Sequence, residues 1–402
     1  MNQVSGLRAA GDLDLLFGEG GLATMPDRTK AIAALPDNKL ILATGFEIGH
    51  SHKIVRLTER GAPDESFGPG GEVVIPDKSG VDIYPDKIIA LQDGGYLISG
   101  GQKRSENKVH VFRLLENGQL NKAFGDEGIA TVSVEDKDAT GDIQLVASTW
   151  MAVSEQSGKI YLSATYAYSE GIKGVVFRLN ENGSPDTSFN GGFVLIGVQD
   201  AQIGLGSLAV HRDGVLVGGT IFATGYFEGD AFVSRYDDSG KEDTSFGDRG
   251  RVIIPNGTDD RRSFLTSIAV GANNMIVVTG RSGISGVREG LITVLNASGS
   301  FNLVFNNGAP LYSSFLAQLH FYECAIQQSG KIIVMGTGDT RNLIVARYNL
   351  DGSLDRTFAG IGWTVYREMG DFIYKDSSLT ADNKIVILAN QSLKPFAVCY
   401  LG

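Results

Sequence analysis

One phrase occurs seven times along the chain, and this repeat restricts the possible folds more than any other feature of the sequence. Its copies read GDLDLLFGEGG, GAPDESFGPGG, GQLNKAFGDEG, GSPDTSFNGG, GKEDTSFGDRG, GSFNLVFNNG and GSLDRTFAGIG. The Phe residues of successive copies are 50, 57, 65, 57, 59 and 53 residues apart, at Phe17, Phe67, Phe124, Phe189, Phe246, Phe305 and Phe358. A repeat of this length indicates a propeller or a solenoid.

Each repeat contains four short apolar runs separated by turn residues, which is the pattern of β-strands and not of helices. In the first complete repeat the runs cover residues 31–35, 40–44, 53–57 and 72–75. Tight dipeptides that favour hairpin turns join the first two runs of each repeat, at Asp37-Asn38, Asp93-Gly94, Ser157-Gly158, Asp213-Gly214, Asn273-Asn274, Ser329-Gly330 and Asp382-Asn383. The sequence therefore predicts an all-β fold, a seven-bladed β-propeller with four antiparallel strands in each blade.

The two ends of the sequence predict how the ring closes. The last repeat stops after its third apolar run, residues 396–401, and the run that it lacks is found near the start, at residues 21–26. Pairing these two segments would complete the seventh blade and remove two exposed sheet edges. We expect one propeller over residues 1–402, in which residues 11–26 supply the outer strand of the last blade.

Composition limits the possible partners. The 402 residues include 53 Gly, 42% hydrophobic residues and 20% charged residues, as in a globular chain with many tight turns. The formal net charge of −11 disfavours nucleic acid and anionic membrane surfaces. No apolar run approaches the ~18 residues of a membrane span. The start of the chain lacks the basic and apolar segments of an export signal, which leaves a cytoplasmic location and signal-independent export as alternatives.

The repeat also resembles a known family. The phrase LDxxFGxxG, followed by an apolar strand and then by the pattern apolar-DG-K-apolar, is similar to the bacterial delta-60 repeat over nearly the whole chain. The resemblance implies a propeller-like repeat. It implies no particular activity, because proteins with this repeat mostly lack an assigned function.

Charged residues recur at fixed positions around the repeated turn. An Arg lies five residues before the turn Gly and an Asp three residues after it, which gives the pairs Arg56 and Asp64, Arg178 and Asp186, Arg235 and Asp243, and Arg347 and Asp355. A group that occurs in most blades cannot be a single active site, so we predict ion pairs that fix the turn. For Asp14 the corresponding Arg position holds Cys399, and the sequence offers no partner.

Signals for catalysis or metal binding are weak. His50 and His52 have the spacing of two metal ligands on a strand, but we interpret them as surface histidines because no further ligand lies near. The segment from Asp136 to Gly141 begins like a calcium loop, yet Ala147 occupies the position that requires a bidentate Glu. The chain also lacks a phosphate-binding loop and a Gly-x-Ser-x-Gly motif. We therefore expect no catalytic residue, no metal and no cofactor.

The variable loops suggest where a ligand would bind. The hairpins and the repeated turns are regular, whereas the crossovers between blades differ in length and chemistry, as functional loops on a rigid frame often do. Residues just before the innermost strands should point toward the channel, and they include aromatic and charged candidates: Tyr84, Trp150, Arg261, Arg262, His320, Asp371 and Tyr374. The sequence favours a non-enzymatic propeller that binds a protein or a carbohydrate. The alternative is a hydrolase or lyase with acidic residues that hold a metal near the channel.

Overall fold

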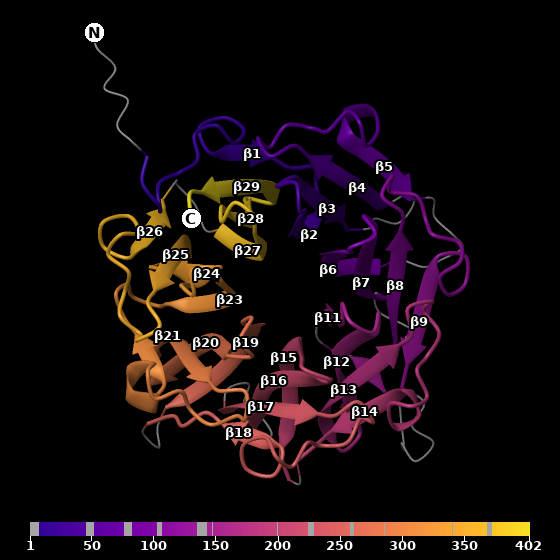
Figure 1. The fold of residues 1–402 in the computed structure, drawn as a ribbon, viewed down its shortest axis with the longest axis vertical. Helices are drawn as coiled ribbons and strands as arrows, with labels where there is room; N and C mark the ends of the chain where they lie inside the picture. The colour runs from indigo at the N-terminus through magenta and orange to yellow at the C-terminus, as the bar shows by residue number, and fades with distance from the viewer. Residues whose placement is uncertain are drawn as a thin grey trace.

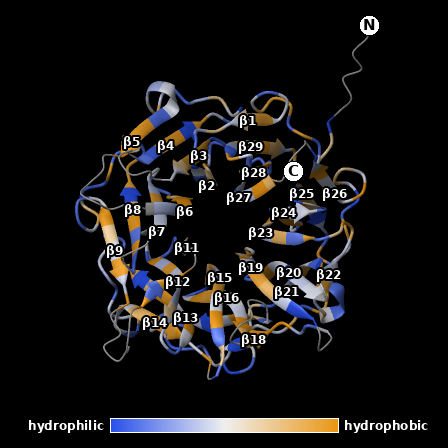
Figure 2. Cartoon of the chain, turned by 180° about the vertical axis from the view of Figure 1, so that it is seen from behind, coloured by the Kyte–Doolittle hydropathy of each residue, from blue (hydrophilic) through white to orange (hydrophobic). Residues whose placement is uncertain are grey.

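The computed structural model confirms the seven-bladed β-propeller (Figure 1). It describes residues 8–45, 52–75, 83–102, 107–134, 143–146, 148–198, 200–223, 229–257, 261–284, 286–339, 341–367 and 372–402. The strands pair antiparallel and, in every blade except blades 3 and 7, follow chain order from the channel outward. Hydrophobic residues occur along the strands of every blade (Figure 2). They form a series of clusters that join the sheets of neighbouring blades.

The blades are numbered here from the first complete sheet. Blade 1 consists of β2 (Thr29–Ala34), β3 (Leu40–Thr44), β4 (His52–Leu57) and β5 (Glu72–Ile75). Blade 2 consists of β6 (Ile83–Ala90), β7 (Tyr96–Gln102), β8 (Lys108–Leu114) and β9 (Ile129–Ser133). In blade 3, β10 (Gln144–Leu145) and β11 (Trp150–Val153) both pair with β12 (Ile160–Tyr168), which is followed by β13 (Gly171–Leu179) and β14 (Phe193–Ile196).

The remaining blades follow the same order. Blade 4 consists of β15 (Gln202–His211), β16 (Gly214–Phe222), β17 (Asp230–Tyr236) and β18 (Arg251–Ile253). Blade 5 consists of β19 (Arg262–Val270), β20 (Ile276–Ile284), β21 (Val287–Leu295) and β22 (Leu311–Ser313). Blade 6 consists of β23 (His320–Ile326), β24 (Ile332–Gly338), β25 (Asn342–Tyr348) and β26 (Trp363–Tyr366). Blade 7 consists of β27 (Phe372–Leu379), β28 (Ile385–Gln391), β29 (Lys394–Tyr400) and β1 (Leu22–Thr24). Short 3₁₀ turns cover Pro69–Gly71, Asn190–Gly192 and Asn306–Gly308.

The ring closes where the two ends of the chain meet, as the sequence predicted. Strand β1 pairs antiparallel with β29, with Leu22 opposite Val398 and Thr24 opposite Phe396. A second contact joins the turns of blades 6 and 7, where the Ala359 N–H donates to the Ala10 carbonyl at 2.7 Å. The N-terminal strand thus covers an edge of β29 that would otherwise be open to pairing with another chain.

The repeated Phe residues fill the space between consecutive turns. All seven are buried, with exposed fractions between 0% and 6%. Most of the turn Gly residues lie close to the Phe of the preceding blade: a Cβ on Gly61 would lie 2.9 Å from the Phe17 ring, and one on Gly118 would lie 2.6 Å from the Phe67 ring. At Gly11 and Gly240 the nearest atoms belong instead to Ala359 and Asn190. Gly61 and Gly118 also have positive φ, 74° and 76°. Only Gly fits this contact without strain, which explains why Gly and Phe recur together.

The Arg and Asp residues of the turns lie within ion-pair distance of each other. Arg56, Arg178 and Arg347 each place Nε 2.8 Å from Oδ2 of the Asp eight residues later, at Asp64, Asp186 and Asp355. Arg235 pairs with Asp243 and also with Asp213 of the neighbouring hairpin. These pairs join the turn to the third strand at the hairpin end of the blade.

A Lys that follows the hairpin dipeptide provides a second cation for the same carboxylates. Lys39, Lys159 and Lys331 approach the turn Asp of their blade to 3.1, 2.7 and 3.2 Å. Lys384 lies 3.1 Å from Asp14, the residue for which the sequence offered no Arg. The Lys of the DG-K pattern therefore accounts for the pairing of Asp14. Cys399, at the expected Arg position, is a buried free thiol, and Cys324 is a free thiol as well.

Removal of residues 1–26 tests the closure of the ring. The deletion eliminates β1 and the Ala10 contact, so it exposes the edge of β29. We expect aggregation and a melting temperature at least about 5 °C lower. The control is deletion of residues 1–7, which retains every closing contact named above. An unchanged melting temperature in the longer deletion would contradict this account of closure.

The Arg235→Ala substitution tests the turn pairs. It leaves the Asp243 carboxylate, whose side chain is 17% exposed, without its guanidinium partner. We expect the free energy of unfolding to fall by about 2 to 4 kcal/mol in denaturant titrations. Arg356→Ala is the matched control, because Arg356 is exposed in an equivalent turn. Equal stability of the two variants would show that the pair does not stabilise the fold.

Candidate functional site

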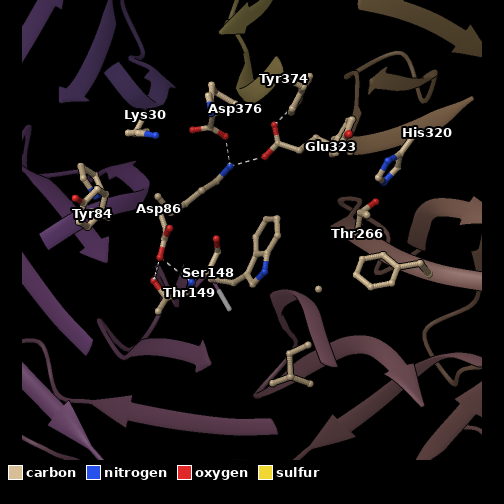
Figure 3. A pocket seen from close by; sticks show the side chains of 18 residues that line it. Lys30, Tyr84, Asp86, Ser148, Thr149, Thr266, His320, Glu323, Tyr374 and Asp376 are labelled. Atoms are coloured by element: carbon tan, nitrogen blue, oxygen red, sulfur yellow. Dashed lines mark hydrogen bonds and ion pairs between the residues drawn. The ribbon is translucent and has the colours of Figure 1, made fainter. Parts of the chain in front are cut away.

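A cavity of about 520 Å³ lies in the channel and is lined by the inner strands (Figure 3). All seven blades contribute to its wall, through Lys30, Tyr84 to Lys87, Ser148 to Trp150, Leu205, Gly206, Phe264, Thr266, His320, Tyr322, Glu323 and Tyr374 to Asp376. The volume falls within the range of about 300 to 1,000 Å³ that is usual for sites of small ligands. The cavity lies toward the starts of the inner strands, away from the hairpins.

A β-bulge in the inner strand supplies one wall residue from each of six blades. In each of these strands the register against the second strand shifts by one residue, which leaves a single residue without a Cα partner: Lys30, Asp86, Gly206, Thr266, Tyr322 and Lys375. All six line the cavity. In blade 3 the inner strand is interrupted between β10 and β11, and Ser148 and Thr149 lie in the break. We call these positions the bulge tier, because a bulge re-aims its side chain.

The residue after each bulge forms a second tier that connects neighbouring blades. The Ser207 hydroxyl accepts a hydrogen bond from the Ile268 N–H at 2.9 Å, and Ser267 accepts one from Cys324 at 3.3 Å. Asp376 accepts the equivalent bond from the Ile32 N–H at 2.8 Å. In blades 2, 3 and 6 this tier holds Lys87, Trp150 and Glu323, each at the same register position.

Three charged residues of the second tier meet within the channel. Lys87 Nζ lies 2.5 Å from Glu323 Oε1 and 2.6 Å from Asp376 Oδ1, so one ammonium joins blade 2 to blades 6 and 7 (Figure 3). Blade 1 separates blades 2 and 7, and its residue in this tier is the small Ala31. Glu323 also accepts hydrogen bonds from the Tyr374 hydroxyl, at 2.8 Å, and from Ser377. We call Lys87, Glu323 and Asp376 the channel cluster.

Burial sets the protonation of the channel cluster. It raises the pKa of Asp376 to about 7, and the nearby Glu323 adds to this effect against the opposing charge of Lys87. Burial also acts to raise the pKa of Glu323, but Lys87 and the hydroxyls of Ser377 and Tyr374 bring it below its usual value. The higher pKa of Asp376 means that this carboxyl takes up a proton at a higher pH than an ordinary Asp, while Glu323 stays ionised beside Lys87.

Aromatic rings form part of the same wall. Tyr322 stacks between His320, at 3.9 Å between ring centroids, and Tyr374, at 4.8 Å. Trp150 lies opposite, with Lys87 Nζ 5.9 Å from its ring centroid. Burial and then the charges of Arg281 and Arg288 lower the pKa of His320 to about 3, so the imidazole is neutral at physiological pH. The cavity thus combines flat apolar faces with fixed polar groups.

Asp86 is the remaining carboxylate of the wall, and its pKa is a test of the geometry. Its carboxylate accepts hydrogen bonds from the Thr149 N–H at 2.8 Å and the Thr149 hydroxyl at 2.9 Å. Burial raises the pKa of Asp86 to about 6 against these bonds and the charge of Lys30. We expect Lys30→Gln to raise the pKa further, because it removes a nearby positive charge.

Carboxyl-carbon NMR titration measures this pKa directly. Lys122→Gln serves as the control, since Lys122 is exposed in a turn. A wild-type pKa near 4 would show that Asp86 is solvated and would contradict its placement in the wall.

Four of the residues that the sequence singled out line the cavity: Tyr84, Trp150, His320 and Tyr374. The two arginines do not. Arg261 pairs with Glu289 and lies 4.1 Å from the Tyr312 ring, while the exposed Arg262 donates to the Arg261 carbonyl at 3.0 Å. Asp371 lies outside the described residues, as do His50 and the calcium-like segment 136–141. His52 was interpreted as a surface residue, which is wrong: it is 5% exposed and packs near Phe112.

The bulge tier was not predicted from the sequence, although two signals in the sequence mark it. Every bulge residue lies seven positions before the hairpin dipeptide, as 37 − 30, 93 − 86, 213 − 206, 273 − 266, 329 − 322 and 382 − 375 all equal 7. In four blades the second strand also carries a Gly opposite the bulge: Gly100, Gly219, Gly280 and Gly336. A Cβ at these glycines would lie 2.0 to 2.3 Å from a carbonyl oxygen of the inner strand. An isolated Gly in a strand is a recognised sign of a bulge.

Two further observations concern metals and membranes. Within the described ranges, no three or more His, Cys, Asp or Glu residues are grouped so that they could hold a metal ion. In the same ranges, no helix has the length and apolarity needed to cross a membrane.

A family model matches two parts of the chain. The model is described as a β-propeller domain of unknown function, DUF5122, and it matches residues 155–189 and 327–358. Each matched stretch runs from a hairpin to the repeated turn. The match supports a β-propeller repeat family. No protein with a curated description matches the chain significantly.

Solved structures resemble the chain in fold. The polysaccharide lyase Uly1 matches with a TM-score of 0.55 and 10% identity, over 100% of this chain and 94% of the lyase. Sqt1 from Chaetomium thermophilum matches with a TM-score of 0.50 and 14% identity, over 94% of this chain and 97% of Sqt1. A PQQ-bound aldose sugar dehydrogenase from Streptomyces coelicolor has a TM-score of 0.41 at 11% identity, over 94% of this chain and 95% of that chain. The likeness shows the fold alone.

Proposed function

We propose that this protein is a binding propeller whose central cavity recognises a carbohydrate. The observation that carries the proposal is the wall of the cavity, where the rings of Trp150, Tyr322 and Tyr374 face the same space as fixed hydroxyl and carboxyl groups. A sugar ring has an apolar face of C–H groups and a rim of hydroxyls. Aromatic faces and convergent hydrogen-bonding groups are complementary to these two features.

The shape of the site favours a carbohydrate over a protein partner. The sequence-predicted residues that line the cavity, Tyr84, Trp150, His320 and Tyr374, are on inner strands of several blades. The cavity in the channel has a volume of about 520 Å³. A protein partner would need a broader surface, since stable protein interfaces bury roughly 800 Å² on each side. A single saccharide or the end of a chain requires far less area.

The channel cluster favours binding over catalysis. Glu323 and Asp376 share the Lys87 ammonium, and Glu323 also accepts two hydroxyl hydrogen bonds. These contacts hold both carboxyl groups in place and give them a structural role between blades. A hydrolase or lyase with a metal near the channel remains the alternative, and turnover of any bound saccharide would favour it.

We also propose that the chain belongs to the delta-60 repeat family. The support is the LDxxFGxxG phrase, whose Phe packs against the turn Gly of the next blade, and the DG-K pattern, whose Lys reaches the turn Asp. The family model that matches residues 155–189 and 327–358 includes the Lys and the Phe of two repeats.

Trp150→Ala tests the binding function. We expect it to weaken saccharide binding about tenfold, or ~1.4 kcal/mol, because the ring offers the largest flat face of the wall. Trp363 is the only other Trp in the chain and lies on the outer strand β26. A Trp363→Phe variant therefore leaves Trp150 as the sole tryptophan fluorophore and should bind like the wild type.

The wild type is first screened on a glycan array. Binding of the saccharide is then followed by fluorescence titration of the Trp363→Phe variant, and thermal melts test whether both variants are folded. A fluorescence change on binding would place the saccharide near Trp150. Capture of no glycan by the wild type, or wild-type affinity in a folded Trp150→Ala variant, would overturn the proposal.

A further inference from the structure

Two lysines of the bulge tier face the cavity from neighbouring blades. Lys30 is the bulge residue of β2 in blade 1, and Lys375 is that of β27 in blade 7. Hydrogen bonds from the Ile32 N–H to Asp376 and from the Ala34 N–H to Ser378, both 2.8 Å, hold these two strands side by side. The two lysine side chains therefore begin at neighbouring positions of the cavity wall, and the charge of Lys30 acts on Lys375.

Neither ammonium has a carboxylate partner within ion-pair distance in the described part of the chain. The carboxyl groups of the wall are bound elsewhere: Glu323 and Asp376 by Lys87, and Asp86 by Thr149. Both lysines are half-buried. Burial, together with the charge of Lys30, lowers the pKa of Lys375, which is the effect of two like charges held close in a partly desolvated place.

This arrangement is unusual in a protein with a formal net charge of −11. The same wall holds Asp86, Glu323 and Asp376, yet within the described residues neither Lys30 nor Lys375 forms an ion pair with a carboxylate. Two adjacent ammonium groups that retain their hydrogen-bonding capacity bind an anionic oxygen group well, because each bond is charge-assisted and the anion relieves their mutual repulsion.

We propose that Lys30 and Lys375 form an anion subsite, and that the carbohydrate bound in the cavity is acidic, with a carboxylate or sulfate group held by these two lysines. This inference rests on the proposed carbohydrate-binding function of the same cavity. In this arrangement the anionic group lies at blades 1 and 7, and the sugar ring extends toward Trp150 in blade 3. The lysines define the charge of the ligand, and the aromatic groups bind its rings.

The test compares three trisaccharides at constant ionic strength: trigalacturonate, the neutral product of reducing its carboxyl groups, and a sulfated galactose trisaccharide. The variants are a double variant that combines Lys30→Gln with Lys375→Gln, the single variants Lys375→Gln and Trp150→Ala, and Lys122→Gln. The last is the control for loss of a surface lysine. We expect the wild type to prefer an acidic probe over the neutral one by at least about tenfold, and the double variant to lose this preference. Preference for the uronate or for the sulfated sugar identifies which acidic group the subsite takes.

A second readout uses inorganic sulfate and needs no saccharide. Sulfate should raise the melting temperature of the wild type more than chloride does at equal ionic strength, and this difference should vanish in the folded double variant. If all three trisaccharides bind equally well and Trp150→Ala weakens each of them, the carbohydrate function stands and the anion subsite is wrong. If only the sulfate effect is seen, the subsite stands and the carbohydrate function fails. If neither is seen, both are overturned.

Discussion

The contact between successive turns is the interaction on which the propeller depends. In most blades a Phe packs against the turn Gly of the next blade, and at Gly61 and Gly118 the distance excludes any side chain on the Gly. The turns also exchange backbone hydrogen bonds, such as the 2.7 Å bond from Gly18 to the Arg60 carbonyl. Because the contact repeats from blade to blade, a small error in the angle between neighbouring blades would accumulate around the ring. The ring closes through the bond between Ala359 and Ala10 and the pairing of β1 with β29, and this closure fixes the angle between every pair of neighbouring blades.

The closed frame gives the inner strands a function that they could not have in an isolated sheet. Each inner strand contributes at most four residues to the cavity, and the wall exists because the ring brings these strands together. The channel cluster illustrates this dependence, since Lys87, Glu323 and Asp376 belong to three blades and lie far apart in the sequence. The ion pairs of Lys87 with both carboxyl groups form only in the closed ring. Folding of the frame and assembly of the site are therefore a single event.

The fold was predictable from the sequence because its signals are local and repeated seven times. The hairpin dipeptides, the apolar runs and the turn phrase each report on a few adjacent residues, and the missing strand of the last repeat indicated the closure. The site was less predictable. Tyr84, Trp150, His320 and Tyr374 line the cavity, whereas Arg261 is held by Glu289 and Tyr312 within its own blade. A bulge shifts the inner strand by one residue, so counting from the start of a strand misplaces its side chains. Contacts across the channel, such as that of Lys87, have no signature in any one repeat.

The bulge tier separates the residues that fold the protein from those that meet a ligand. A bulge residue has no Cα partner in the second strand, so its side chain is not required for the register of the sheet. Lys, Asp, Gly, Thr and Tyr all occupy this position on nearly the same backbone. A change at one blade therefore alters one sector of the wall and leaves the other sectors in place. The propeller is in this sense a set of interchangeable recognition positions, from which new specificities can evolve or be engineered one blade at a time.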